Sequence, residues 1–260
     1  MKHLLLDDLN ATAVPISALP EVDFCTPWQR FDYAAIQPGE SIDIADEDES
    51  GEQGYLVLNG QLELAAQNSA QPGERLSGSN GEAPAFIIGP LGLHHRLTNT
   101  GAETARVLHV SVATATPSVD RRIYVGYFAA ELLKWRDAIH GGSGRIATRH
   151  VLQPEDFHST WTFLDQAILS AGGSVGYHYH DALEECFVVT KGQGYMTIDD
   201  ETFAVGPGSV TWQGIGQGHG IYNPGPGELD FLRIAVAQPD EEYTTIDLHD
   251  NLAGRTPNAD

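Results

Sequence analysis

The sequence predicts an all-β protein made of two tandem, related halves, and two observations support this. Short segments of β-branched and aromatic residues recur about every ten residues, separated by turn sequences such as QPGE and NPGPG. This rhythm is typical of antiparallel strands in a sandwich or barrel. In addition, three stretches of the first half match three stretches of the second half in the same order. We therefore expect a duplicated β domain.

The repeat defines the predicted domains. The matching segments are 32–41 with 165–174, 52–64 with 184–196, and 89–101 with 213–225. The offset in residue number between matching positions of the two halves decreases across residues 65–84 of the first half. This polar stretch, rich in Gly, Ser and Pro, is typical of an enlarged surface loop. The predicted units are an N-terminal barrel over 1–118, a connector over 119–145, and a C-terminal barrel with an acidic tail over 146–260.

Two segments depart from the strand rhythm. The sequence FAAELLKWRDAIH, at 128–140, places Phe128, Leu132, Trp135 and Ile139 on one helical stripe before a glycine. This pattern predicts a short connecting helix between the halves. The acidic tail that begins QPDEEYTTIDLHD has no strand rhythm, and we expect it to be loosely attached.

Composition limits the partners and the location. The chain has 36 acidic residues against 14 Lys and Arg, a formal net charge of −22, so a nucleic acid or an anionic membrane surface would be repelled. Cys25 and Cys186 lie far apart and indicate neither a disulfide framework nor a zinc–thiolate site. No apolar run approaches the ~18 residues of a membrane span, and MKHLLLDDLN is too short for a signal-peptide core. A cytoplasmic location is expected.

The stretch GGSVGYHYHDALEECFVVTKGQG, at 172–194, predicts a metal site. Alternate residues of a strand share a face, so His178 and His180 point the same way. The following strand places Glu184 and Glu185 on opposite faces, so one of them faces the histidines. A third histidine, His219, lies in a later glycine-rich stretch. Three imidazoles and one carboxylate suit Fe(II), Mn(II), Ni(II), Co(II) or Zn(II).

The spacing in this region resembles the two motifs of the cupin superfamily. The first motif is matched by Gly172-x5-His178-x-His180-x4-Glu185-x6-Gly192, and the second by Gly208-x5-Gly214-x-Gly216-x2-His219-x3-Asn223. Gly214 stands where the family usually has proline, which is a turn residue and not a ligand.

The resemblance implies two tandem cupin barrels of the double-stranded β-helix or jelly-roll type. It also implies one divalent transition metal per chain, Fe(II) first and then Mn(II), Ni(II) or Zn(II), held by His178, His180, Glu185 and His219. Glu184 has the wrong spacing and strand parity for a ligand, so a supporting or surface role is expected.

The first half departs from this pattern. It keeps the second motif as Pro90-x-Gly92-x2-His95-x3-Asn99, but the positions that match His178, His180 and Glu185 are Asp46, Asp48 and Gln53. The N-terminal barrel is therefore expected to be structural. A weak cation site formed by Asp46, Asp48 and His95 is the alternative.

Candidate substrate residues follow from strand parity. Phe187 continues the face of Glu185, and Ile221 follows His219. If the face of Phe231 lines the barrel, Arg233 would be a cation in a mainly apolar interior, where it could pair with a substrate carboxylate. If the face of Leu232 points inward instead, Arg233 is a solvent-exposed strand residue.

Three functions are compatible with this site. The first is a mononuclear non-haem Fe(II) dioxygenase, an oxidoreductase acting on a small organic acid or related metabolite. The second is a non-redox lyase, isomerase or aminohydrolase, since ureidoglycine aminohydrolase is similar in having a degenerate first barrel and a metal-bearing second one. The third is a non-catalytic small-molecule-binding cupin. A homodimer is also expected, because the edge strands of barrels need covering.

Overall fold

A computed structural model describes residues 3–9, 12–45, 51–66, 73–78, 85–89, 94–114 and 123–256. These residues form antiparallel strands and four short 3-10 helices, which confirms the predicted all-β class. The 3-10 helices are η1 (Leu6–Asp8), η2 (Ala130–Leu132), η3 (Pro154–Asp156) and η4 (Leu252–Arg255). Within the described ranges, no helix is long and apolar enough to cross a membrane.

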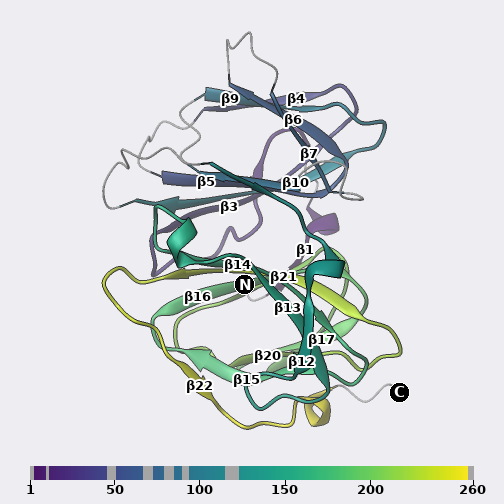
Figure 1. The fold of residues 1–260 in the computed structure, drawn as a ribbon, viewed down its shortest axis with the longest axis vertical. Coiled ribbons are helices and arrows are strands. Elements are labelled where there is room, and N and C mark those ends of the chain that lie inside the picture. The colour runs from purple at the N-terminus through teal and green to yellow at the C-terminus, as the bar shows by residue number, and fades with distance from the viewer. Residues whose placement is uncertain are drawn as a thin grey trace.

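The first barrel consists of a six-stranded and a four-stranded sheet, drawn at the top of Figure 1. The six-stranded sheet has the order β11 (Tyr124–Gly126), β8 (Phe86–Gly89), β5 (Gly51–Asn59), β10 (Ala105–Ala113), β3 (Trp28–Ile36) and β2 (Ile16–Ser17). The four-stranded sheet has the order β4 (Ser41–Ala45), β9 (His94–Asn99), β6 (Gln61–Ala66) and β7 (Glu74–Ser77). Strand β7 lies within the stretch expected to be an enlarged loop.

The second barrel repeats this arrangement with a seven-stranded and a five-stranded sheet. The seven-stranded sheet has the order β1 (His3–Leu5), β19 (Ser209–Gln213), β16 (Leu183–Lys191), β21 (Leu229–Ala237), β14 (Trp161–Leu169), β13 (Arg145–Leu152) and β12 (Lys134–Asp137). The five-stranded sheet has the order β18 (Glu201–Val205), β17 (Gly194–Ile198), β20 (His219–Tyr222), β15 (Ser174–His180) and β22 (Thr245–Asp247).

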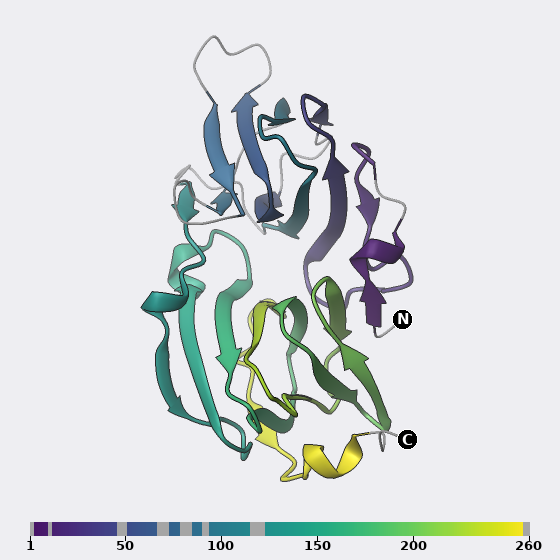
Figure 2. The same ribbon diagram turned by 90° about the vertical axis from the view of Figure 1, so that its right-hand side faces the viewer.

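The first strand of the chain joins the second barrel. Strand β1 pairs with β19, and Leu4 lies opposite Val210. Figure 2 shows this purple N-terminal segment beside the green strands of the lower barrel. The seven-stranded sheet of the second barrel thus includes a strand from the N-terminal end of the chain. The domain boundaries 1–118, 119–145 and 146–260 stay a prediction.

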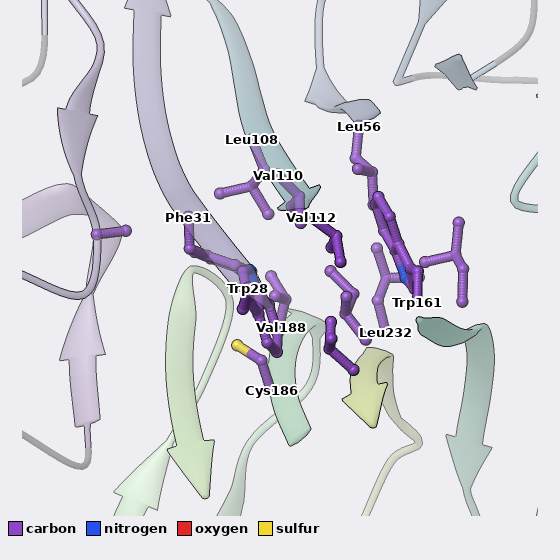
Figure 3. Close-up of a cluster of buried hydrophobic side chains, with 14 of the residues drawn as sticks. Trp28, Phe31, Leu56, Leu108, Val110, Val112, Trp161, Cys186, Val188 and Leu232 are labelled. Atoms are coloured by element: carbon purple, nitrogen blue, oxygen red, sulfur yellow. The ribbon is translucent and has the colours of Figure 1, made fainter. Parts of the chain in front are cut away.

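The two barrels pack against each other through the outer faces of their larger sheets. On β21, Leu232, Ile234 and Val236 belong to the core shared between the barrels, whereas Phe231 lies in the core of the second barrel. Leu108, Val110 and Val112 of β10 come from the first barrel, and Figure 3 shows several of these side chains meeting. These strands are covered on both faces, by their own barrel and by the other one. Their sequences are therefore apolar over long runs and do not alternate with polar residues.

Two buried glutamates also join the barrels in a reciprocal way. The carboxylate of Glu184 accepts hydrogen bonds from the backbone of Cys25 at 2.9 Å and from the backbone and hydroxyl of Thr26 at 3.1 and 2.5 Å. At the matching position of the first barrel, Glu52 accepts hydrogen bonds from the backbone of His158 and Ser159 at 3.2 Å and from the Ser159 hydroxyl at 2.7 Å. Each barrel thus holds the segment that leads into the other.

The connecting helix expected over 128–140 is wrong. This segment contains only the three-residue η2 and the strand β12, which pairs with β13 so that Trp135 lies opposite Ala147. Trp135 remains 40% exposed, and the Arg145 guanidinium lies 5.6 Å from the centre of its ring. Pairing with an available sheet edge has overridden a modest helical preference, as tertiary context commonly does.

Candidate metal centre

The structure brings together the four residues expected as metal ligands. His178 and His180 project from β15, Glu185 from β16 and His219 from β20, and one potential ligand atom from each lies within 4.8 Å of all the others. His178 lies opposite His219 in the pairing of β15 with β20. All four side chains are buried. Among the described residues this is the one cluster of its kind.

Hydrogen bonds orient the three imidazoles toward a common centre. Nδ1 of His178 donates to the Gly176 carbonyl at 2.8 Å, and Nδ1 of His219 donates to the Gln217 carbonyl at 2.9 Å. Nδ1 of His180 lies 3.0 Å from the hydroxyl of Thr245. With each Nδ1 engaged in this way, Nε2 is left to act as the ligand, an arrangement common around protein-bound metals.

The inner atoms of the cluster fit a divalent cation. Nε2 of His178 and Oε1 of Glu185 are buried without a hydrogen-bond partner. The other carboxylate oxygen of Glu185 lies 3.1 Å from Nε2 of His219 and 3.3 Å from Nε2 of His180. Buried polar atoms without partners are costly, and a bound cation removes that cost by accepting their lone pairs. His178, His180, Glu185 and His219 could therefore hold a divalent metal.

The surroundings of His178 and Glu185 favour the protonation states in which these two residues bind a metal. Burial, reinforced by His219, lowers the pKa of His178 far below its ordinary value. Burial alone would raise the pKa of Glu185, but the Arg233 guanidinium and the adjacent rings of His180 and His219 outweigh it and hold that pKa well below its usual range. Neutral imidazoles and an ionised carboxylate are the forms that bind metals.

Arg233 lies on the inner face of β21, the same face as Phe231. It donates to the buried carboxylate of Asp165, and its Nη1 lies 3.5 Å from Oε1 of Glu185. Its guanidinium also lies 5.2 Å from the centre of the Phe163 ring. Nε of Arg233 is buried without a hydrogen-bond partner. Its role as an anchor for a substrate carboxylate stays a prediction, and the structure shows that two protein carboxylates already surround it.

The other predicted residues take different places. Phe187 and Ile221 are buried in the core of the second barrel, and the Phe187 ring lies 6.1 Å from that of His219. Glu184 faces the first barrel and does not join the cluster. In the first barrel, Asp46, Asp48, Pro90 and Gly92 lie outside the described residues.

Sequence reasoning missed two segments that complete the centre. From the connector, the ring of His140 stacks on that of His178 with 4.2 Å between centroids. Gly176 makes this possible, since a Cβ there would lie 1.8 Å from the His140 carbonyl oxygen. From the tail, Thr245 contacts His180, and β22 pairs with β15. The expectation of a loosely attached tail is therefore wrong over 245–247, and the β-branched run TTI was the available signal.

In the first barrel, Gln53 and His95, which match Glu185 and His219, both contact other side chains of the protein. Nε2 of His95 lies 2.6 Å from the hydroxyl of Tyr55, and Nε2 of His109 donates to Oε1 of Gln53 at 2.6 Å. The rings of Tyr55 and His109 stack with 4.6 Å between centroids. The structural role expected for this barrel stays a prediction, since Asp46 and Asp48 lie outside the described residues.

Comparisons with known proteins give a consistent result. A family model described as Cupin domain matches residues 166–235. The oxalate-binding protein of Thermotoga maritima is 28% identical over 98 residues, which cover 38% of this chain and 81% of that protein.

Two solved structures share the fold over nearly the whole chain. An IolB-like protein from Salmonella typhimurium aligns with a TM-score of 0.68 and 15% identity, covering 96% of this chain and 98% of that one. A variant of oxalate decarboxylase from Bacillus subtilis aligns with a TM-score of 0.58 and 14% identity, covering 95% of this chain and 79% of that one. The Bacillus subtilis oxalate decarboxylase has Mn(II) centres.

Proposed function

The chain belongs to the cupin superfamily. On this premise we propose that it is a metal-dependent enzyme that acts on a small organic acid. The acid would bind to a metal held by His178, His180, Glu185 and His219. The observation that carries the proposal is the set of inward-facing ligand atoms, of which His178 Nε2 and Glu185 Oε1 have no hydrogen-bond partner. A site that is built only for structure leaves no ligand position open, whereas four protein donors leave at least one position open on a five- or six-coordinate ion.

Oxalate is the first candidate for the acid. The support is the oxalate-binding relative from Thermotoga maritima, together with the charge of this site. A metal ion offers positive charge to one end of a dicarboxylate, and the nearby Arg233 retains a buried Nε–H that no residue accepts. Arginine binds carboxylates through such donors.

For the reaction we place an Fe(II)-dependent oxidation of the acid by O2 first: with oxalate the C–C bond breaks to give two CO2, and O2 takes up the two electrons with two protons to give hydrogen peroxide. A bound divalent metal would supply an electron-rich centre for O2 chemistry if it is Fe(II), or Lewis-acid polarisation of the acid if it is Mn(II), Ni(II) or Zn(II). The apolar side chains of Phe187 and Ile221 exclude water from the interior beside the ligands. A second candidate is binding of oxalate without turnover, which the name of the Thermotoga maritima relative favours.

The test begins with the metal. Protein purified without added metal is analysed for its elements, stripped with chelator and reloaded separately with Fe(II), Mn(II), Ni(II) or Zn(II). Each form is then titrated with oxalate by calorimetry and assayed for oxygen uptake and carbon dioxide release. Oxygen uptake that depends on oxalate and is matched by carbon dioxide release supports the oxidation, and binding without any product supports the second candidate. Failure of every metal to bind would overturn the whole proposal.

A further inference from the structure

The tail of the chain forms a strap beside the metal centre. It leaves the end of β21 with the backbone N–H of Gln238 bonded to the Ala182 carbonyl at 2.9 Å, and it ends with the backbone N–H of Leu248 bonded to the Tyr177 carbonyl at 2.8 Å. In Figure 1 this yellow segment runs along the outside of the lower barrel to β22 beside β15. We call residues 238–248 the strap.

Two threonines fix the middle of the strap. The backbone N–H and the hydroxyl of Thr244 bond to the two carboxylate oxygens of Asp181, both at 2.6 Å. The hydroxyl of Thr245 meets Nδ1 of the ligand His180 at 3.0 Å. The residue just before this pair, Tyr243, is thereby held at a defined place next to the centre.

Tyr243 packs beside the ligand His180. Its ring lies 5.7 Å from that of His180 in an edge-on arrangement. Its side chain hydrogen-bonds to none of the described residues, and the residue is 36% exposed. Burial raises the pKa of the phenol, and Glu185 raises it further while Arg233 lowers it. Within the described part of the chain, this hydroxyl is therefore a donor without an acceptor.

We infer that Tyr243 donates a hydrogen bond to the acid bound at the metal centre, and that the strap carries this residue for that purpose. The inference rests on the proposed function. A metal-bound carboxylate retains oxygen lone pairs that need donors, and the neighbouring Phe187 and Ile221 offer none. The guanidinium of Arg233 donates to Asp165 through Nη2, so it has only part of its donor capacity left for the acid. The free phenol is the donor at the solvent side of the centre.

The test compares Tyr243→Phe with Tyr179→Phe, since Tyr179 lies on β15 next to His180 but on the opposite face of the strand. Both variants and the wild type are loaded with Co(II), whose visible spectrum reports ligand binding. Oxalate and azide are titrated into each, and Co(II) affinity is measured by competition with a chelator. We expect Tyr243→Phe to weaken oxalate binding about tenfold, the effect of one lost bond to a charged group. Co(II) affinity should stay within about twofold, because a bond to the acid plays no part in holding the metal.

The outcomes separate this inference from the proposed function. Equal oxalate binding by Tyr243→Phe and wild type would overturn the inference, as would an equal loss in Tyr179→Phe or a matching loss of Co(II) affinity. If wild type binds azide but not oxalate, the proposed ligand is wrong, and the azide dissociation constants decide the role of Tyr243 alone. An azide dissociation constant about tenfold higher for Tyr243→Phe than for the wild type supports that role, and equal dissociation constants overturn it. A wild type that binds neither probe overturns both.

Discussion

The two barrels can be compared at two matching positions of the described residues, those of Glu185 and His219 in the second barrel, and their inner contacts differ there. In the second barrel, Glu185 and His219 meet across the interior at 3.1 Å with Phe187 beside them. In the first barrel the corresponding Gln53 and His95 each have another partner. Tyr55 takes the place of Phe187 and supplies a hydroxyl to His95, 2.6 Å away.

The barrels also differ at the position of Arg233, which is His109 in the first barrel. Arg233 lies opposite Asp165 in the second barrel, and His109 lies opposite Asp32 in the first. His109 donates to Gln53, whereas Arg233 lies beside Glu185. The comparison teaches that two features distinguish the metal centre from the first barrel: a carboxylate at position 185 in place of an amide, and Phe187 in place of a tyrosine whose hydroxyl contacts the inner histidine.

The strongest way to break this comparison is to remove ligands from each barrel. The double variant His178→Ala, His219→Ala should lose the metal, with affinity lowered by more than about 100-fold, because two of the four donors are gone. His95→Ala, the matched control in the first barrel, should keep the wild-type metal content. Elemental analysis after reloading measures both. Metal retained by the double variant, or lost by the control, would contradict the assignment.

Glu184 and Glu52, which bind backbone N–H groups between the barrels, provide a second comparison. Removing the charge of either one should destabilise the protein to the same extent. Glu184→Gln and Glu52→Gln should each lower the free energy of unfolding by about 2 kcal/mol, because each replaces charge-assisted hydrogen bonds to backbone N–H groups. Urea denaturation of the metal-free protein gives both values. Glu184→Gln should still bind one metal per chain, and loss of the metal would show that Glu184 acts on the centre and not between the barrels.

Low pH should destabilise the metal-free protein through one buried histidine in each barrel. Burial lowers the pKa of His109 from 6.5 to about 3, and it lowers that of His178 further. Both imidazoles stay neutral in the folded state while the unfolded chain binds protons below about pH 6.5, so stability falls as pH decreases through that value. Glu185 contributes only below about pH 4.5, since its pKa is also lowered on folding.

At pH 5.5, one pH unit below the ordinary histidine pKa of 6.5, His109 and His178 should each lower the free energy of unfolding by about 1.4 kcal/mol. Urea denaturation at pH 7.5 and pH 5.5 measures the sum, and His109→Gln should remove only the contribution of the first barrel. An unchanged pH dependence in that variant would show that His109 titrates in the folded protein as it does in the unfolded chain.

The sequence predicted the elements whose evidence is local or repeated. Strand parity placed His178 and His180 on one face, and the repeat indicated that Gln53 marks a barrel without a complete site. It did not predict that Trp135 joins a sheet edge, because the partner strand β13 is a tertiary feature. Nor could it predict Thr245 or Tyr243 at the centre, since their contacts with His180 depend on how the chain returns from β21.

The smallest expected effect concerns the hydroxyl that distinguishes Tyr55 from Phe187. Tyr55→Phe makes the first barrel like the second at this position and leaves Nε2 of His95 without the bond at 2.6 Å. We expect a loss of about 1 to 2 kcal/mol in the free energy of unfolding, because a buried ring nitrogen loses its partner. We expect no gain of metal, because Gln53 offers no charge. The control Phe187→Tyr adds the hydroxyl to the second barrel, where it would compete for His219 and lower metal affinity. If Tyr55→Phe binds a second metal per chain, the missing carboxylate is not what silenced the first barrel.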